Sequence, residues 1–396
     1  MLKSQQMRKR IALHLSVLII GGAVIRVAVV PAEVCPPVTA LEVSASIEAA
    51  TTWLVGGMAD DGTYTYGFDR DEGVINQGYN YARHGGVTMS LYQAYEVIGD
   101  PDLLAAADAG LAHALNDIVE HGDWMGWQPG GDIPLGANGL LLAALSIRRR
   151  ATGDTVHDEL MRGIARFLVG QQQENGSIFA SWDIRAGEPR ESFGPFATGE
   201  AAWALALLDR QMPAEGWGEA SGLTLDYMGE DRNRLEGYVT SLPDHWAAYT
   251  VSDIRPDLLT TGRVEYARRL AGYFGIRLRF EAQRRGDGIN LWLRWYPGPP
   301  AGVGAAGEGI GALHRLSVEE PRLADLTAAI EERLVCTAGF MVRRQISADE
   351  ATGGATASLE SGAWFYRGYT QMDDQQHVLS ALLAALPVLE AMEEVG

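Results

Sequence analysis

The chain has 396 residues, of which 47% are hydrophobic and 21% charged, so it is long enough to bury a large core and does not have the composition of a disordered chain. Its formal net charge is -19 at pH 7. An acidic surface repels phosphate backbones, so nucleic acid is excluded as an expected partner.

The first 35 residues predict an export signal or a membrane anchor. A basic stretch at residues 3–10 precedes an apolar run from Ile11 to Ile25. That run is shorter than the roughly 20 apolar residues that cross a bilayer, and extending it to Val30 takes in Arg26. A cleaved signal peptide and an uncleaved anchor both fit this pattern. Because basic residues before the run stay inside, we expect the rest of the chain in the periplasm or outside the cell, either released or anchored to the membrane.

The chain contains two cysteines, Cys35 and Cys336. Two are too few for a disulfide framework, although they allow one bridge. They are also too few for a zinc site made of several cysteines.

Residues 36–396 predict one domain built from helical hairpins. A first helix falls in residues 40–58, and a glycine-punctuated loop follows. The pattern of two amphipathic stretches around a turn then appears twice, with the turns at Gly99-Asp100-Pro101 and Thr152-Gly153-Asp154. A third copy starts at Gly199. A hairpin that recurs in this way cannot bury its apolar face alone, so neighbouring copies must pack together.

The second half of the chain has weaker patterns. Residues 216–237 read as irregular and acidic, and residues 297–309 read as a long loop over a cavity. First helices at about 43, 86, 138, 199, 246 and 308, with a last helix at 377–394 closing a ring, give five to six hairpins. In such a ring the loops before the inner helices gather at one end and frame a cavity, where we expect a site.

The repeats in residues 43–396 resemble the α/α-toroid superfamily, which contains the six-hairpin glycosidases and the terpenoid cyclases. A local match at Phe167, Gln172 and Gly176 resembles the Gln-Trp repeat of the cyclases, although a glycine-capped helix end explains the same residues. The aspartate motifs of the cyclases are incomplete here, since Gln371 and Met372 precede Asp373-Asp374. The resemblance therefore implies an all-α fold, an α/α toroid, and activity on a carbohydrate.

Glycoside cleavage by inversion needs one protonated and one ionised carboxyl group on opposite sides of the sugar. We expect Asp374 or Glu308 to act as the acid and Asp244 as the base, with Glu200 and Glu360 as further candidates. For each of these residues the competing interpretation is a helix cap or a solvated surface charge.

Other candidates lie at the starts of the expected inner helices. We expect His377 in the catalytic set, because it follows Asp373-Asp374 at the start of the last helix. The predicted substrate-binding residues combine hydrogen-bonding side chains with aromatic platforms, and they are Tyr81, Arg83, His84, His245, Trp246, Trp364, Tyr366 and Asp373.

Three other functions stay open. His84, His245 and His377 would suit a sugar epimerase or lyase, because histidine exchanges protons near neutral pH. A non-catalytic helical scaffold that binds glycans or an envelope partner, or a terpenoid cyclase-like protein, would use the same repeats. We expect a carbohydrate or glycan as the partner, and neither a cofactor nor a metal, since no histidines show the close spacing of a metal motif. The oligomeric state is left open.

Overall fold

The computed structural model describes residues 2–25, 32–237, 244–284, 297–352 and 356–395. Arg26 and Val30 of the predicted export segment lie outside these ranges. The first helix is α1 (Leu2–Val24). No helix within the described residues is both long and apolar enough to span a membrane.

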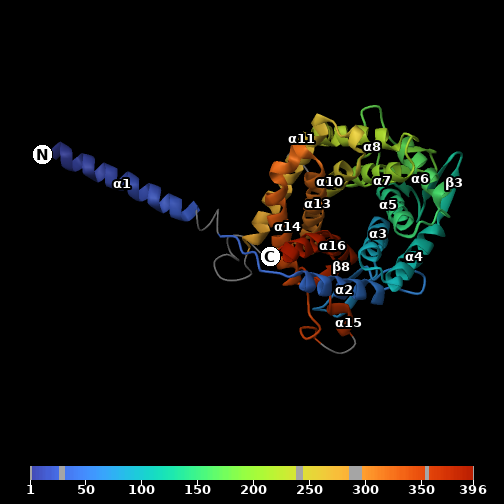
Figure 1. The fold of residues 1–396 in the computed structure, drawn as a ribbon, viewed down its shortest axis with the longest axis horizontal. Coiled ribbons are helices and arrows are strands. Elements are labelled where there is room, and N and C mark those ends of the chain that lie inside the picture. The colour runs from blue at the N-terminus through green and yellow to red at the C-terminus, as the bar shows by residue number, and fades with distance from the viewer. Residues whose placement is uncertain (1, 26–31, 238–243, 285–296, 353–355, 396) are drawn as a thin grey trace.

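Six helices form an inner ring (Figure 1). Each packs against the next in chain order, and the last packs against the first, so the ring is closed. The inner helices are α3 (Tyr81–Ile98), α5 (Leu135–Thr152), α7 (Ala197–Gln211), α10 (His245–Asp253), α13 (Pro300–Glu319) and α16 (Met372–Val395). This arrangement confirms the predicted α/α toroid and sets the number of hairpins at six.

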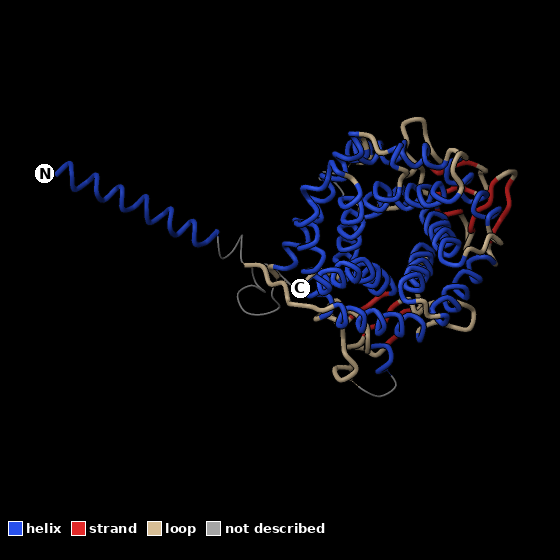
Figure 2. The backbone as a smooth tube through the Cα atoms, viewed as in Figure 1, coloured by secondary structure: helices blue, strands red, loops and turns tan. Residues whose placement is uncertain are grey.

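A second layer of helices surrounds the ring, as the tube in Figure 2 shows. Its members are α2 (Ala40–Gly56), α4 (Pro101–Leu115), α6 (Asp158–Gly170), α8 (Trp217–Glu230), α11 (Thr261–Ala282) and α14 (Thr327–Val342). The apolar core lies between the two layers, because each helix buries one face against its partner.

One prediction about the ring was wrong. The helix in residues 40–58 was expected to be the first inner helix, but α2 lies in the outer layer and packs against α16 (Figure 1). The first outer helix therefore pairs with the last inner helix, so the two ends of the domain close the ring together. Sequence spacing could not show this, because the two helices are more than 300 residues apart.

The predicted hairpin turns are confirmed at both glycines. Gly99 ends α3 with φ 77°, and Gly153 ends α5 with φ 75°. A positive φ of this size costs glycine little, so it is the favoured residue for ending a helix in this way. Asp100 then caps α4, where its carboxylate accepts the backbone N–H of Asp102.

Two segments expected to be irregular are helical. Residues 216–237 contain α8 and the short α9 (Arg232–Leu235), and residues 297–309 contain the first half of α13. Both helices are rich in glycine, which is why the sequence pattern did not indicate them. The glycines lie where another segment of the chain comes close. A Cβ at Gly222 would lie 2.5 Å from the Arg263 guanidinium, and one at Gly304 would lie 2.5 Å from the His377 backbone.

Short strands lie in the loops between helices. They form three small antiparallel groups: β1 (Gly67–Asp69) with β2 (Val74–Asn76) and β8 (Tyr369–Gln371), β3 (Ile118–His121) with β4 (Trp124–Trp127), and β5 (Ile133–Pro134) with β6 (Ser181–Asp183) and β7 (Glu188–Arg190). The first sheet matters for the site, because it joins the loop before α3 to the loop before α16. Two short 3-10 helices also lie in the connections, at Pro256–Leu258 and Pro321–Leu326.

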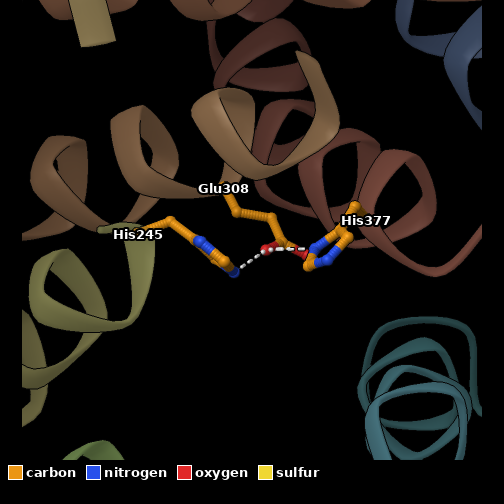
Figure 3. Close-up of side chains that lie close together, drawn as sticks. All are labelled: His245, Glu308 and His377. Carbon is orange, nitrogen blue, oxygen red and sulfur yellow. Dashed lines mark hydrogen bonds and ion pairs between the residues drawn. The ribbon is translucent and has the colours of Figure 1, made fainter. Parts of the chain in front are cut away.

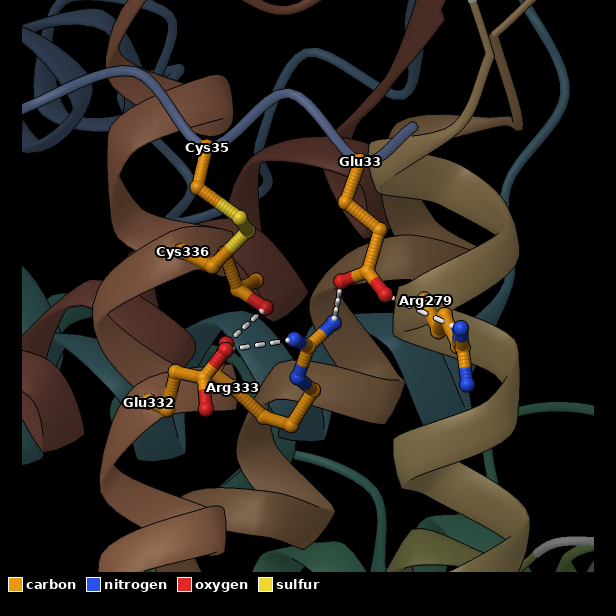
Figure 4. The surroundings of a disulfide bond; sticks show 7 residues. Glu33, Cys35, Arg279, Glu332, Arg333 and Cys336 are labelled. Atoms are coloured by element: carbon orange, nitrogen blue, oxygen red, sulfur yellow. Dashed lines mark hydrogen bonds and ion pairs between the residues drawn. A yellow bond between two sulfur atoms is a disulfide. The ribbon is translucent and has the colours of Figure 1, made fainter. Parts of the chain in front are cut away.

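The bridge that two cysteines allow is present between Cys35 and Cys336 (Figure 4). It joins the segment before α2 to α14. Glu33 adds ion pairs to Arg279 of α11 at 2.9 Å and to Arg333 of α14 at 2.5 Å. Together these contacts fix residues 33–36 on the outer layer.

Candidate active site

A cavity of about 410 Å³ opens at the N-terminal ends of the inner helices. Its lining comes from all six inner helices or the loops just before them, together with α11. The polar lining residues are Asn80, Arg83, Glu200, His245, Arg277, Asp373, Gln376 and His377, and Phe196, Trp246 and Phe274 supply aromatic surface. The expectation that inner-helix starts frame a cavity is therefore confirmed.

Three buried side chains meet at the base of this cavity (Figure 3). Glu308 of α13 lies between His245 of α10 and His377 of α16. Its Oε2 is 3.1 Å from His377 Nδ1 and 3.3 Å from His245 Nε2. The second contact is too poorly aligned for a hydrogen bond, and His245 Nε2 makes none with any described residue. The two imidazole rings are almost perpendicular, with centroids 5.0 Å apart.

The two histidines differ in charge. Burial lowers the pKa of His245 well below its usual value, and the positive charges of His377 and Arg277 lower it further. Burial also acts against a charge on His377, but the carboxylates of Glu308 and Asp373 outweigh it and raise the pKa of His377 to about 10. At neutral pH the cluster therefore holds one neutral imidazole and one imidazolium.

Asp373 supplies an ionised carboxylate at the cavity wall. Burial raises its pKa, but the hydrogen bond and charge of His377 and the charge of Arg83 lower it more, so the net shift is downward. Its carboxylate lies 3.6 Å from His377 Nε2 and 3.5 Å from Arg83 Nε. Arg83 also donates to Tyr66 Oη at 2.8 Å and to Gln371 Oε1 at 2.6 Å, so its guanidinium is held on several sides.

Glu200 of α7 is a second carboxyl group in the lining, with the opposite charge state. Burial, then the negative charges of Asp244 and Asp373, raise its pKa to about 8. It is therefore mostly protonated at neutral pH. Within the described residues, no side chain or backbone group hydrogen-bonds to its carboxyl. One cavity thus holds a protonated carboxyl group, Glu200, and an ionised one, Asp373. From the sequence alone, Glu200 was only a further candidate for catalysis.

The cluster of His245, Glu308 and His377 has the ligand types of a zinc site. Its three ligand atoms lie within 4.8 Å of one another. The contact from His377 Nε2 to Asp373 also matches the carboxylate support that metal-bound histidines use. The proton on His377 already balances the charge of Glu308, however, so a cation would have to replace that proton.

The other two predicted catalytic carboxylates are engaged with the protein. Asp244 is fully buried, accepts Arg232 Nη1 at 2.7 Å and caps α10 through the Trp246 N–H at 3.0 Å. Asp374 accepts the backbone N–H groups of Ala301 at 2.8 Å and Gln371 at 3.0 Å. Neither residue lines the cavity. Their predicted catalytic roles stay predictions, and their contacts are those of helix caps.

Two predicted binding residues near the start of α3 point away from the cavity. His84 lies behind the inner ring, where Nδ1 is 2.6 Å from Tyr79 Oη and Nε2 is 2.8 Å from the Gly110 carbonyl. Tyr81 packs edge-on against Trp127. Neither side chain is part of the lining. The sequence placed both correctly at an inner-helix start but could not give the direction of the side chain.

Three candidates from the segment before α16 also lie elsewhere. Trp364 is buried in the core and donates Nε1–H to the Met341 carbonyl at 2.8 Å. Tyr366 belongs to the turn that leads into β8. Glu360 pairs with Arg70 at 3.0 Å. Of the residues predicted from this segment and the start of α16, only Asp373 and His377 line the cavity. Trp246 and His245 of α10 line it as well.

Arg277 and Gln376 line the cavity but were not predicted. Gln376 donates to Glu308 Oε1 at 3.1 Å and so fixes the second oxygen of that carboxylate. Gln376 lies beside His377 in a segment already marked as polar. Arg277, by contrast, comes from the outer helix α11, and no sequence pattern indicated that an outer helix contributes to the site.

A larger cavity of about 1060 Å³ opens at the opposite end of the ring, where the inner helices end. Trp203 and Tyr249 form part of its wall, and none of the predicted site residues lines it. The Gln-Trp-like segment lines neither cavity. The Gln172 side chain instead donates to the Ala220 carbonyl and to Thr224 Oγ1, which joins the end of α6 to α8.

The double ring defines the protein as an α/α toroid of the six-hairpin type. No known family model and no curated protein matches its sequence. Solved structures share the fold. A cellobiose 2-epimerase from Spirochaeta thermophila matches with a TM-score of 0.61 and 13% identity, over 89% of this chain and 97% of that one.

Two further neighbours act by hydrolysis according to their names. An unsaturated glucuronyl hydrolase specific for heparin matches with a TM-score of 0.59 and 14% identity, over 88% of this chain and 98% of its own. An α-mannanase from Bacteroides thetaiotaomicron matches with a TM-score of 0.60 and 10% identity, over 89% of this chain and 97% of its own. At these identities the likeness shows the fold alone.

Proposed function

We propose that this protein is a carbohydrate-active enzyme that moves a proton at a sugar carbon, as a sugar epimerase or isomerase. The observation that carries the proposal is the pair of histidines on either side of Glu308, one neutral and one protonated, at the base of a cavity. Two such groups in contact are suited to taking a proton from one atom and giving a proton to another.

The reacting atom is a carbon next to the carbonyl of an open-chain sugar. Neutral His245, which lines the cavity, takes the proton from that carbon. The electron pair moves onto the carbonyl oxygen, and His377 supplies a proton to it, which gives an enediol. His245 then returns its proton to carbon, while the enediol hydroxyl that becomes the carbonyl gives its proton back to His377. Return to the opposite face of the same carbon, after the enediol has rotated, yields an epimer, and return to the neighbouring carbon yields an isomer.

Glu308 and the other wall residues prepare this step. Glu308 stabilises the positive charge on His377, and Gln376 holds the second oxygen of Glu308 in place. Arg83 is fixed by Asp373, Tyr66 and Gln371, so its guanidinium is ready to bind a sugar hydroxyl. Trp246 borders the cavity and stacks on Trp203, so it supports the wall beside His245.

A glycoside hydrolase is the second candidate, and the pair of Glu200 and Asp373 favours it. Protonated Glu200 would give its proton to the leaving oxygen, while ionised Asp373 would act as base or nucleophile. The names of the neighbouring structures include both epimerases and hydrolases, so the fold is compatible with either reaction.

We also propose that the protein is exported, and that its signal or anchor ends before Glu33, because Glu33 and Cys35 are bonded to the outer layer. A disulfide between Cys35 and Cys336 supports this location, because such bridges persist outside the reducing cytosol.

The test compares two variants in D₂O with a panel of aldoses, ketoses and oligosaccharides. His245→Asn removes the base while keeping a polar side chain, and Glu200→Gln removes the acid of the second candidate. An epimerase or isomerase loses at least about 100-fold of its deuterium incorporation in His245→Asn. Hydrolysis that is lost in Glu200→Gln and kept in His245→Asn would establish the second candidate instead.

A further inference from the structure

The cations of the cavity differ in how their charge is balanced. Arg83 pairs with Asp373, and His377 pairs with Glu308 and Asp373. Arg277 has no carboxylate within ion-pair distance among the described residues. Glu281, one turn along α11, is already shared by Arg284 and Arg344. A guanidinium with no carboxylate partner in the described part of the chain therefore faces a cavity in a protein whose net charge is -19.

The position of Arg277 is built into the fold. Its guanidinium lies against Gly302 in the first turn of α13, where Nη2 would be 2.5 Å from a Cβ at that glycine. Any side chain at residue 302 would occupy the place of the guanidinium. Arg277 is also close enough to His245 for its charge to lower the pKa of that histidine. The cation thus lies beside the proposed reaction centre.

We propose that the substrate is a sugar with an anionic group, a carboxylate or a phosphate, which binds Arg277. This inference rests on the proposed function, since it names the substrate class of the same site. A guanidinium presents two parallel N–H groups that match a carboxylate or phosphate, and it cannot lose its proton at working pH. Among the cavity cations, Arg277 is the one whose donors are not already used by a carboxylate of the described chain.

Binding is measured by calorimetry, separately from turnover, with D-glucose, D-mannose and D-galactose, the matching uronates and the matching 6-phosphates. Comparison of uronates with phosphates identifies the anionic group. Arg277→Gln should weaken binding of the preferred anion by about 10- to 100-fold, as expected for a lost hydrogen bond to a charged group. Arg277→Lys should keep part of the affinity. Gly302→Ala keeps the charge but displaces it, and should weaken binding as well.

Arg268→Gln is the matched control, because it removes one positive charge from the outer face of the same helix, where Arg268 pairs with Asp325. It should leave anion binding as it is. Equal binding of neutral and anionic sugars, with no change in Arg277→Gln, would overturn the inference. That result is distinct from failure of the proposed function, which would appear as uronate or phosphate binding without any proton exchange.

Discussion

His245 and His377 are the same residue type in the same cluster, but their neighbours give them opposite charge states. His377 has two carboxylates within 3.6 Å, whereas His245 lies near two cations, His377 and Arg277, and has one poorly aligned carboxylate contact. The proposed reaction uses this difference directly, since one imidazole must accept a proton while the other donates one.

The pH profile of proton exchange follows from these pKa shifts. Activity requires neutral His245, so it rises with pH through the pKa of His245, which lies below 6.5. Activity also requires protonated His377, so it falls as the pH passes about 10. The expected profile is flat through neutral pH, with its alkaline limb near 10. An alkaline limb near 8, the pKa of Glu200, would indicate that Glu200 is the acid instead.

Metal removal tests the other chemistry that the cluster permits. We expect protein dialysed against EDTA to keep its full rate of proton exchange, because His377 balances the charge of Glu308 without a cation. Protein dialysed without chelator is the control. Loss of activity that Zn²⁺ restores would show that His245, Glu308 and His377 hold a metal ion instead.

Helix position separates Arg277, which sequence reasoning missed, from four residues that it found. His245, Glu308, Asp373 and His377 lie on inner helices, where chain position alone predicts closeness to the cavity. Arg277 comes from an outer helix and reaches the cavity across Gly302. The direction of a side chain around its helix depends on packing, which is why Trp364 and His84 were expected at the cavity and lie in the core.

At the scale of elements, the contact between α13 and α16 brings Glu308 to His377. The two helices approach closely because small residues face each other. A Cβ at Gly304 would lie 2.5 Å from the backbone of His377, and one at Gly311 would lie 2.5 Å from the Ala384 side chain. Gly304 and the other glycines of residues 297–309 made this segment resemble a loop, so the small residues that allow the close approach also hid the helix.

Gly304→Ala should therefore damage the site as well as the fold. The added methyl group clashes with a backbone that cannot move aside alone, and we expect a loss of about 1–3 kcal/mol in the free energy of unfolding. Displacement of Glu308 from His377 should lower proton exchange at least about 10-fold. Urea unfolding and exchange assays measure the two effects.

Gly272→Ala is the control, since nothing lies within 4 Å of a Cβ at that position in α11. It should stabilise the helix by up to about 1 kcal/mol. If Gly304→Ala behaved in the same way, the close approach of α13 and α16 would not be what positions Glu308.

At the scale of the whole molecule, the ring is closed by the two ends of the domain. The sequence predicted the repeats and the two glycine turns, because helix period and helix ends are local properties. It could not predict that α2 pairs with α16, since that contact joins the start and end of the chain. The disulfide reinforces the same region by joining Cys35 to α14.

Loss of this bridge should destabilise the whole domain. It joins residues 301 positions apart, so reduction frees a long loop in the unfolded chain, and we expect a loss of about 2–5 kcal/mol. Urea unfolding with and without reductant measures this loss in the free energy of unfolding. The double variant Cys35→Ser with Cys336→Ser should not respond to reductant. An unfolding midpoint of the natural protein that reductant does not shift would contradict the expected stabilisation.

The central claim is that the cluster of His245, Glu308 and His377 exchanges a proton with a sugar carbon. The most direct measurement incubates the protein in D₂O with neutral and anionic sugars and follows each carbon by NMR. We predict that deuterium appears at the carbon next to the carbonyl, that an epimer or isomer forms, and that both are lost in His245→Asn and His377→Asn. Sugars that are cleaved, or left unchanged, with no deuterium on carbon would contradict the claim.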